Sequence, residues 1–106
     1  MSPKEQPTSR DQEPTLFAAE LSDAVPSVDL HGSRVHEAIA EVERLIHGAF
    51  MNGDEAVKII HGRGTGKLKT AVEQCLRENK EIVAAFRGSS RPHEQGAVIV
   101  VALHKK

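Results

Sequence analysis

A chain of 106 residues, 39% of them hydrophobic, has room for one domain with a modest core and none for a second. The absence of an apolar run of about 18 residues, and of an apolar segment near the N-terminus, predicts a cytoplasmic protein without a membrane span or signal peptide. Two basic and five acidic side chains fall within residues 1–25, so residues 26–106 hold twelve basic and ten acidic ones. This small positive excess permits a local basic face.

The first 25 residues differ in composition from the rest of the chain. Residues 1–15 are rich in Pro, Ser, Thr, Glu and Gln, which predicts disorder because they offer little apolar surface to bury. Residues 16–21 form an apolar patch that is long enough for one or two helical turns, and such a helix would dock on the domain. The alternative is that these residues belong to a linker and are hydrophobic only incidentally. We expect a disordered acidic tail over residues 1–25 and a folded domain over residues 26–106.

Two similar units open the folded part. Each is a short apolar run that ends in His-Gly, followed by a segment with apolar residues every three or four positions, which predicts strand, turn and helix. The first strand covers residues 28–30 and its helix ends at Asn52-Gly53, whereas the second strand covers residues 56–60 and its helix residues 66–78. Two such units predict parallel strands, because a crossover helix returns the chain to the same end of the sheet.

The last two strands are expected at residues 82–86 and 97–103. The second of them is apolar throughout, which is typical of a strand inside a sheet, and their connection is too short for a crossover, which predicts antiparallel pairing. The element order is therefore βαβαββ, an α/β domain with a mixed four-stranded sheet and two helices on one face. The single cysteine, Cys75, shares helical spacing with apolar residues and is expected to be a core thiol rather than a nucleophile.

The first His-Gly pair follows a carboxylate. Strand periodicity places Asp29 and His31 on one face and Val28 and Leu30 on the other, where they would join the core. A carboxylate beside an imidazole fixes its tautomer, as an orienting group does for a catalytic base. The alternative is that Asp29 binds a backbone N–H group and His31 only ends the strand.

The second His-Gly pair begins a glycine-rich turn. Residues 61–67 read His-Gly-Arg-Gly-Thr-Gly-Lys between a strand and a helix, where glycines allow a phosphate to approach the backbone. The spacing fits neither the dinucleotide fingerprint nor the Walker A loop, so a phosphate of a nucleic-acid backbone is the better candidate ligand. The alternative is a tight turn that needs glycine for its geometry alone. Strict alternation sends His61 toward the core side, so sequence leaves open whether the two histidines converge.

The two motifs, the helix between them and the closing apolar strand together resemble the Smr (small MutS-related) domain, which also occurs at the C-terminus of a MutS-like subfamily. The resemblance covers about residues 26–103, and residues 16–26 resemble the segment that precedes the domain in stand-alone bacterial members. It implies a two-layer α+β sandwich similar to the C-terminal domain of translation initiation factor three. It also implies nucleic-acid binding, with nicking or RNA endonuclease activity in several members and little or no cleavage in others.

Family expectation assigns the Asp-Leu-His motif, here Asp29 and His31, to catalysis, and residues 61–66 to substrate binding and catalysis. We therefore expect an endonuclease in which His31 and His61 act on a phosphodiester. The candidate nucleic-acid contacts are Gly62, Arg63, Gly64, Thr65, Gly66, Lys67, Lys69, Arg87 and Arg91.

The expected partners are RNA or DNA, with ribosome association as one setting, and the expected state is a monomer that does not bind membranes. An RNA substrate supplies its 2′-hydroxyl as nucleophile and needs no metal, whereas DNA requires a water molecule and favours Mg²⁺ or Mn²⁺ with Asp29 as ligand. The histidine spacing does not indicate a structural zinc site. Two alternatives stay open: a non-catalytic nucleic-acid or ribosome-binding module, and a protein-interaction domain.

Overall fold

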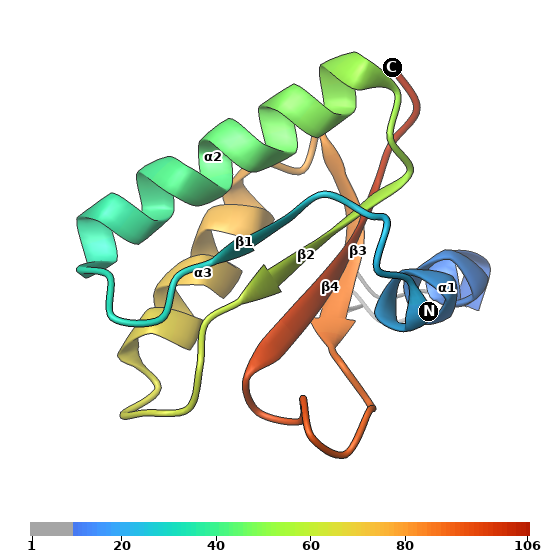
Figure 1. Ribbon diagram of the computed structural model, residues 1–106. Helices are drawn as coiled ribbons and strands as arrows, with labels where there is room; N and C mark the ends of the chain where they lie inside the picture. Colours follow the sequence, from blue (N-terminus) through green and yellow to red (C-terminus); the bar gives the residue numbers. More distant parts are fainter. Residues whose placement is uncertain (1–9) are drawn as a thin grey trace, which may run out of the picture.

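The structure, a computed structural model, describes residues 10–106, which form a four-stranded mixed sheet with helices on both faces (Figure 1). The fold is of the α+β class, with the strand and helix order predicted from residue 28 onward. The elements in chain order are a 3-10 turn at Arg10–Gln12, α1 at Glu13–Leu21, β1 at Ser27–Asp29, α2 at Val35–Asn52, β2 at Ala56–Ile60, α3 at Lys67–Glu78, β3 at Val83–Gly88 and β4 at Val98–Leu103.

The strand order across the sheet is β1-β2-β4-β3. Strands β1 and β2 are parallel and β3 and β4 are antiparallel, as predicted, and β4 is also antiparallel to its other neighbour, β2, a pairing that the sequence did not predict. All six residues of β4 are buried, which agrees with its apolar sequence and its place inside the sheet. The parallel pairing brings the turns that follow β1 and β2 to one edge of the sheet (Figure 1).

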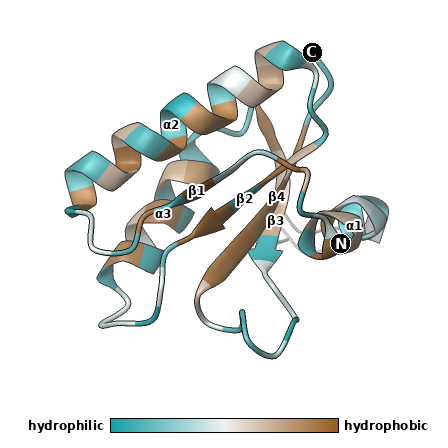
Figure 2. Cartoon of the chain, viewed as in Figure 1, coloured by the Kyte–Doolittle hydropathy of each residue, from teal (hydrophilic) through white to brown (hydrophobic). Residues whose placement is uncertain are grey.

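The main core lies between the sheet and the helices α2 and α3. Val28 and Leu30 face these helices, as predicted, together with Val57 and Ile59 of β2. The apolar residues of α2 and α3 lie on the sides that face the sheet (Figure 2). Cys75 belongs to this core, and burial is the main reason that its pKa rises to about 11. Such a thiol stays protonated near neutral pH, which fits the predicted core role.

Helix α2 confirms the predicted C-terminal boundary. It ends at Gly53, which adopts the left-handed conformation with φ of 83° and closes the last turn. At its start, Arg34 directly precedes the helix, and the carboxylate of Glu37 accepts a hydrogen bond from the backbone N–H of Arg34 at 3.4 Å. None of the described helices combines the length and the apolar character that crossing a membrane requires.

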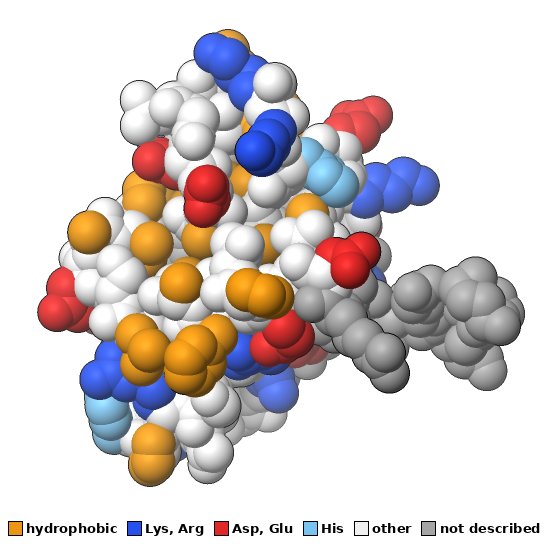
Figure 3. Space-filling view, turned by 90° about the vertical axis from the view of Figure 1, so that its right-hand side faces the viewer, with side chains coloured by type: hydrophobic (Ala, Val, Ile, Leu, Met, Phe, Trp, Pro, Cys, Tyr) orange, Lys and Arg blue, Asp and Glu red, His pale blue; other side chains and the backbone are white. Residues whose placement is uncertain are grey.

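A second, smaller core covers the opposite face of the sheet. Leu16 and Ala19 of α1 pack there against small side chains, and the members contributed by the sheet are Ala56, Ala85, Val100 and Ala102. The predicted disorder is therefore wrong for residues 10–15, which are helical, while residues 1–9 lie outside the described residues. The docking of the apolar patch at residues 16–21 was predicted, although Phe17 and Leu21 stay exposed; Figure 3 shows hydrophobic side chains at the surface on this side of the molecule.

Candidate functional site

A pocket of about 390 Å³ lies at the edge of the sheet where the two His-Gly turns meet. Its walls come from the turn after β1, the whole turn between β2 and α3, the first turn of α3 and Gly96, which lies two residues before β4. The lining residues are His31, Gly32, His61, Gly62, Arg63, Gly64, Thr65, Gly66, Leu68, Lys69 and Gly96. The two histidines therefore converge on one pocket, which sequence had left open.

His61 keeps the alternation of β2 and faces the helix side of the sheet. Its side chain is buried, with 6% of its surface exposed, and its backbone N–H donates to the carbonyl oxygen of Ala97 at 2.8 Å. The N–H of Gly62 donates to the same oxygen at 3.0 Å. The end of the loop that leads into β4 thus holds the backbone of the His61-Gly62 pair.

The ring of His61 has one nitrogen in a hydrogen bond. Nδ1 lies 2.8 Å from the carbonyl oxygen of Gly62, and because a carbonyl only accepts, Nδ1 carries the proton. Burial lowers the pKa of His61 below its usual value of 6.5, the bond to Gly62 opposes this shift, and the positive charge of Lys69 adds to it. A neutral imidazole protonated at Nδ1 leaves Nε2 with a free lone pair, which is the form that a general base requires.

His31 reaches the pocket from the turn after β1. A methyl group placed at Gly62 would lie 3.8 Å from Cγ of His31, so this ring packs over the glycine. Gly62 also has a φ of 77°, a conformation that residues with side chains rarely adopt. Glycine at this position therefore serves both the turn and the approach of the two histidine-bearing segments.

Asp29 bonds to the backbone of His31. Its Oδ1 atom accepts a hydrogen bond from the N–H of His31 at 2.9 Å, and Asp29 does not line the pocket. This contact corresponds to the alternative reading of the motif, in which the carboxylate holds the turn. Asp29 thus fixes the backbone from which the imidazole of His31 extends, and the contact leaves the ring nitrogens of His31 free to meet a ligand.

The first turn of α3 forms another wall of the pocket. Gly66 precedes the helix with a φ of 91° and provides no side chain to cap it, while Oγ1 of Thr65 accepts a hydrogen bond from the N–H of Lys67 at 3.3 Å. Gly66, Leu68 and Lys69 border the pocket, so it adjoins a helix N-terminus, where N–H groups and the helix dipole attract anions.

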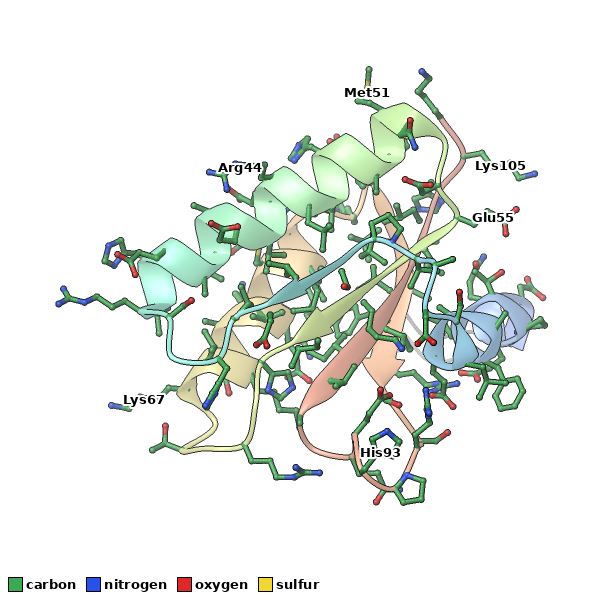
Figure 4. All side chains as sticks on the ribbon, in the orientation of Figure 1. Arg44, Met51, Glu55, Lys67, His93 and Lys105 are labelled. Atoms are coloured by element: carbon green, nitrogen blue, oxygen red, sulfur yellow. The ribbon has the colours of Figure 1, made fainter. Side chains whose placement is uncertain are left out.

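The three basic residues predicted around the turn take different positions. Lys69 lines the pocket, whereas Lys67 is exposed and points away from the fold (Figure 4). Arg63 lines the pocket and donates from Nη2 to the carbonyl oxygen of His93 at 3.1 Å, which ties the glycine-rich turn to the loop before β4. No group of three or more His, Cys, Asp or Glu side chains within residues 10–106 is arranged to hold a metal ion.

The family model of the Smr domain matches residues 28–104, which include both His-Gly turns and nearly the whole sheet. The chain belongs to the Smr domain family. This Smr chain is similar to Endonuclease MutS2 of Caldanaerobacter subterraneus subsp. tengcongensis, with 40% identity over 81 residues, and of Staphylococcus carnosus, with 43% identity over 75 residues. These matches cover 76% and 71% of this chain but 10% and 9% of the relatives, so the chain spans about a tenth of their length.

Two solved structures resemble this Smr domain. The Smr domain of Thermus thermophilus MutS2 is 40% identical to this chain and has a TM-score of 0.69. The match covers 76% of this chain and 99% of the Thermus chain. YdaL, a stand-alone small MutS-related protein from Escherichia coli, is 30% identical and has a TM-score of 0.67, with 74% of this chain and 64% of that chain covered. Both likenesses support the fold expected from the sequence motifs.

Two of the predicted contact residues lie elsewhere in the Smr domain. The Arg87 guanidinium donates to Glu13 and Glu20 of α1, and that of Arg91 donates to the backbone carbonyl of Glu20 at 3.0 Å. Neither residue lines the pocket. The structure therefore does not place these two residues where a ligand in the pocket would meet them, because both side chains bind α1 on the other face of the sheet.

Gly32, Leu68 and Gly96 line the pocket, although none of them was among the predicted site residues. The signal for Gly96 is the antiparallel pairing of β2 with β4, which the sequence motifs did not predict. Because these two strands run in opposite directions, the segment before β4 lies beside the turn that follows β2. Leu68 carries no such signal, since its apolar side chain matches the core pattern of α3.

Proposed function

We propose that this Smr domain binds RNA or DNA in the pocket between the two His-Gly turns and cleaves its phosphodiester backbone. The observation that carries the proposal is the convergence of His31 and His61, from two neighbouring parallel strands, on a pocket that also adjoins the N-terminus of α3. Two imidazoles supply a proton acceptor and a proton donor, and the helix N-terminus with Lys69 attracts the phosphate. The name of the MutS2 relatives, endonuclease, is consistent with this chemistry.

His61 is assigned the role of general base. Its Nδ1 proton is held by the carbonyl of Gly62, so Nε2 is available to take a proton from the nucleophile. With RNA the nucleophile is the 2′-hydroxyl, which attacks the adjacent phosphorus while the bond from phosphorus to the 5′-oxygen breaks. With DNA a water molecule takes the place of the 2′-hydroxyl.

His31 is assigned the role of general acid. The leaving oxygen gains negative charge as its bond to phosphorus breaks, and a proton from His31 neutralises it. The products with RNA are a 2′,3′-cyclic phosphate and a free 5′-hydroxyl. Lys69 and the N–H groups of the glycine-rich turn stabilise the charge on the nonbridging oxygens.

A cleavage assay on end-labelled single-stranded RNA and DNA of one sequence tests the proposal, with Mg²⁺, Mn²⁺ or EDTA added in parallel. We expect His61→Ala and His31→Ala each to slow cleavage by about 10²–10⁴-fold, the usual contribution of general acid–base catalysis, and to retain binding. His47→Ala is the matched control, because this exposed histidine on α2 does not line the pocket.

Two results would contradict the proposal. Cleavage at wild-type rate in His61→Ala would remove the assigned base, and cleavage equally impaired in His47→Ala would show that the assay reports something other than the pocket. If the wild-type protein binds the RNA and the DNA oligonucleotide but cleaves neither, the domain acts as a binding module. The two histidines then serve only to contact the phosphate.

A further inference from the structure

Helix α1 ends in a buried carboxylate that binds the loop before β4. The side chain of Glu20 is 1% exposed, and its oxygens accept hydrogen bonds from Nη1 of Arg87 at 2.8 Å, from the backbone N–H of Ser90 at 2.9 Å and from the hydroxyl of Ser90. Burial raises the pKa of Glu20, but the hydrogen bonds from Ser90 and Arg87 outweigh it and lower the pKa to about 2 from 4.5. The group is therefore charged at every pH at which the protein would act.

The backbone carbonyl of Glu20 is held as well. Nζ of the buried Lys58 donates to it at 3.1 Å, and Nη1 of Arg91 donates to it at 3.0 Å. Lys58 extends from β2, and Nζ of this residue also lies 3.8 Å from Oε2 of Glu94. The C-terminal end of α1 is thus joined to β2, β3 and the loop of residues 89–96 at once.

The loop that Glu20 binds is also a wall of the pocket. Its carbonyl at His93 accepts from Arg63, and the carbonyl of Ala97, at its end, accepts from the backbone N–H groups of His61 and Gly62. Gly96 lines the pocket itself. His93 lies on this loop between β3 and β4 (Figure 4). A continuous set of hydrogen bonds therefore runs from Glu20 through the loop to the backbone of the proposed base.

The match to the family model begins at residue 28, so α1 lies outside it. We propose that Glu20 is a positioning residue, which clamps the loop of residues 89–96 and thereby holds His61, Gly62 and Arg63 in the geometry that the pocket requires. The part of this inference that concerns ligand binding rests on the proposed function. The part that concerns the geometry of the pocket does not.

Glu13 provides a matched control. Its carboxylate also accepts hydrogen bonds from Nε of Arg87, at 2.9 and 3.1 Å, and it also belongs to α1. Within residues 10–106, no hydrogen bond or ion pair joins Glu13 to the loop of residues 89–96. Glu13→Gln therefore weakens the attachment of α1 to β3 and leaves the clamp on the loop in place, whereas Glu20→Gln removes the charge that holds both.

The experiment uses the full chain and compares wild type, Glu20→Gln and Glu13→Gln by hydrogen exchange and by ¹⁵N spectra of the imidazole of His61. In Glu20→Gln we expect the amides of His61 and Gly62 to exchange about tenfold faster or more, because hydrogen bonds to a buried charge are lost and the loop opens more often. We also expect the pKa of His61 to rise toward its ordinary value as its burial decreases. Glu13→Gln should match the wild type in both measurements.

Two outcomes would overturn the clamp. In the first, Glu20→Gln frees the amide of Ser90 but leaves the exchange of His61 and Gly62 and the titration of His61 unchanged. In the second, both variants change these properties equally, which would indicate general loosening of α1. If Glu20→Gln does not fold, Ser90→Ala, which removes only the hydroxyl contact, is judged against Glu13→Gln by the same criteria.

A third measurement separates the clamp from the proposed function. The affinity for a single-stranded oligonucleotide should fall in Glu20→Gln in proportion to the fraction of molecules that keep the loop closed, and should stay at the wild-type value in Glu13→Gln. If wild type itself binds no oligonucleotide, the proposed function fails. Hydrogen exchange and the imidazole spectra still decide the clamp, because neither needs a ligand.

Discussion

The two imidazoles of the pocket differ in their surroundings, although both precede a glycine at the end of a parallel strand. His61 is buried, its Nδ1 proton is held by the carbonyl of Gly62, and its pKa lies below the usual value. His31 is exposed and packs over Gly62, with its backbone held by Asp29. The more constrained ring suits the acceptance of a proton, and the more accessible ring suits its donation to a departing oxygen.

The lowered pKa of His61 predicts a pH dependence of stability. Below pH 6.5 the unfolded chain binds a proton at this ring that the folded protein excludes, so acid favours unfolding until the pH falls below the folded-state pKa. The contribution of the neutral His61 ring to the free energy of unfolding is therefore fully present above pH 6.5 and is lost as the pH falls below that value. Urea unfolding at several pH values between 7.5 and 5 should therefore show a decline in the free energy of unfolding for wild type that is smaller in His61→Gln. Identical pH slopes in the two proteins would refute the burial of a neutral ring.

Gly62 and Gly64 allow a matched test of the glycine-rich turn. Gly62 has a positive φ and contacts His31, whereas a methyl group at Gly64 would meet no atom within 4 Å. Gly62→Ala should lower the free energy of unfolding by about 1–2 kcal/mol, the cost of the left-handed conformation for a residue with a side chain, and should impair cleavage. Gly64→Ala should change stability by less than about 0.5 kcal/mol, as surface substitutions usually do. Equal effects of the two substitutions in a urea titration would contradict the assigned geometry.

Sequence predicted the residues of the pocket better than their contacts. His31, His61 and the glycines follow from local patterns, because the end of a strand and the start of a helix are properties of neighbouring residues. Arg87 was assigned to a ligand, but its partner Glu20 lies 67 positions away along the chain. An ion pair between distant segments depends on the docking of α1, which no local pattern reports.

At the scale of elements, the topology follows from connection lengths and hydrophobic pattern. The parallel β1 and β2, the antiparallel β3 and β4, and the inner place of β4 were all predictable, because a crossover needs a helix and an inner strand needs apolar side chains. The helix α1 was predicted only as a short patch. Its buried positions are Leu16, Ala19 and Glu20, and a glutamate among them conceals the apolar stripe.

The docking of α1 predicts unequal effects for two adjacent residues. Leu16 is fully buried against the sheet, so Leu16→Ala should cost about 2–4 kcal/mol in the free energy of unfolding, through lost contacts and the cavity left behind. Phe17 is 54% exposed, and Phe17→Ala should cost less than about 0.5 kcal/mol. Urea or thermal unfolding of both variants tests this. A larger loss for Phe17→Ala than for Leu16→Ala would show that α1 does not dock on this face.

At the scale of the molecule, the two faces of the sheet are covered by different helices and carry different groups. The face covered by α2 and α3 holds the main core and presents the pocket at its edge, while the face covered by α1 carries buried charges that join the helix to the loop before β4. With a formal net charge of −1, the chain cannot attract nucleic acid through its overall charge. The proposed affinity for nucleic acid would therefore come from the few groups at the pocket, which predicts a site confined to that edge.

The location of the site is tested most directly by an amide ¹H–¹⁵N spectrum of the wild-type protein during titration with a short single-stranded oligonucleotide. We predict shifts that saturate together at His31, Gly32, the turn of residues 61–66, Lys69 and Gly96, since these residues line one pocket. Shifts that gather instead around Phe17 and Leu21, on the outer side of α1, would contradict the assignment of the pocket as the nucleic-acid site.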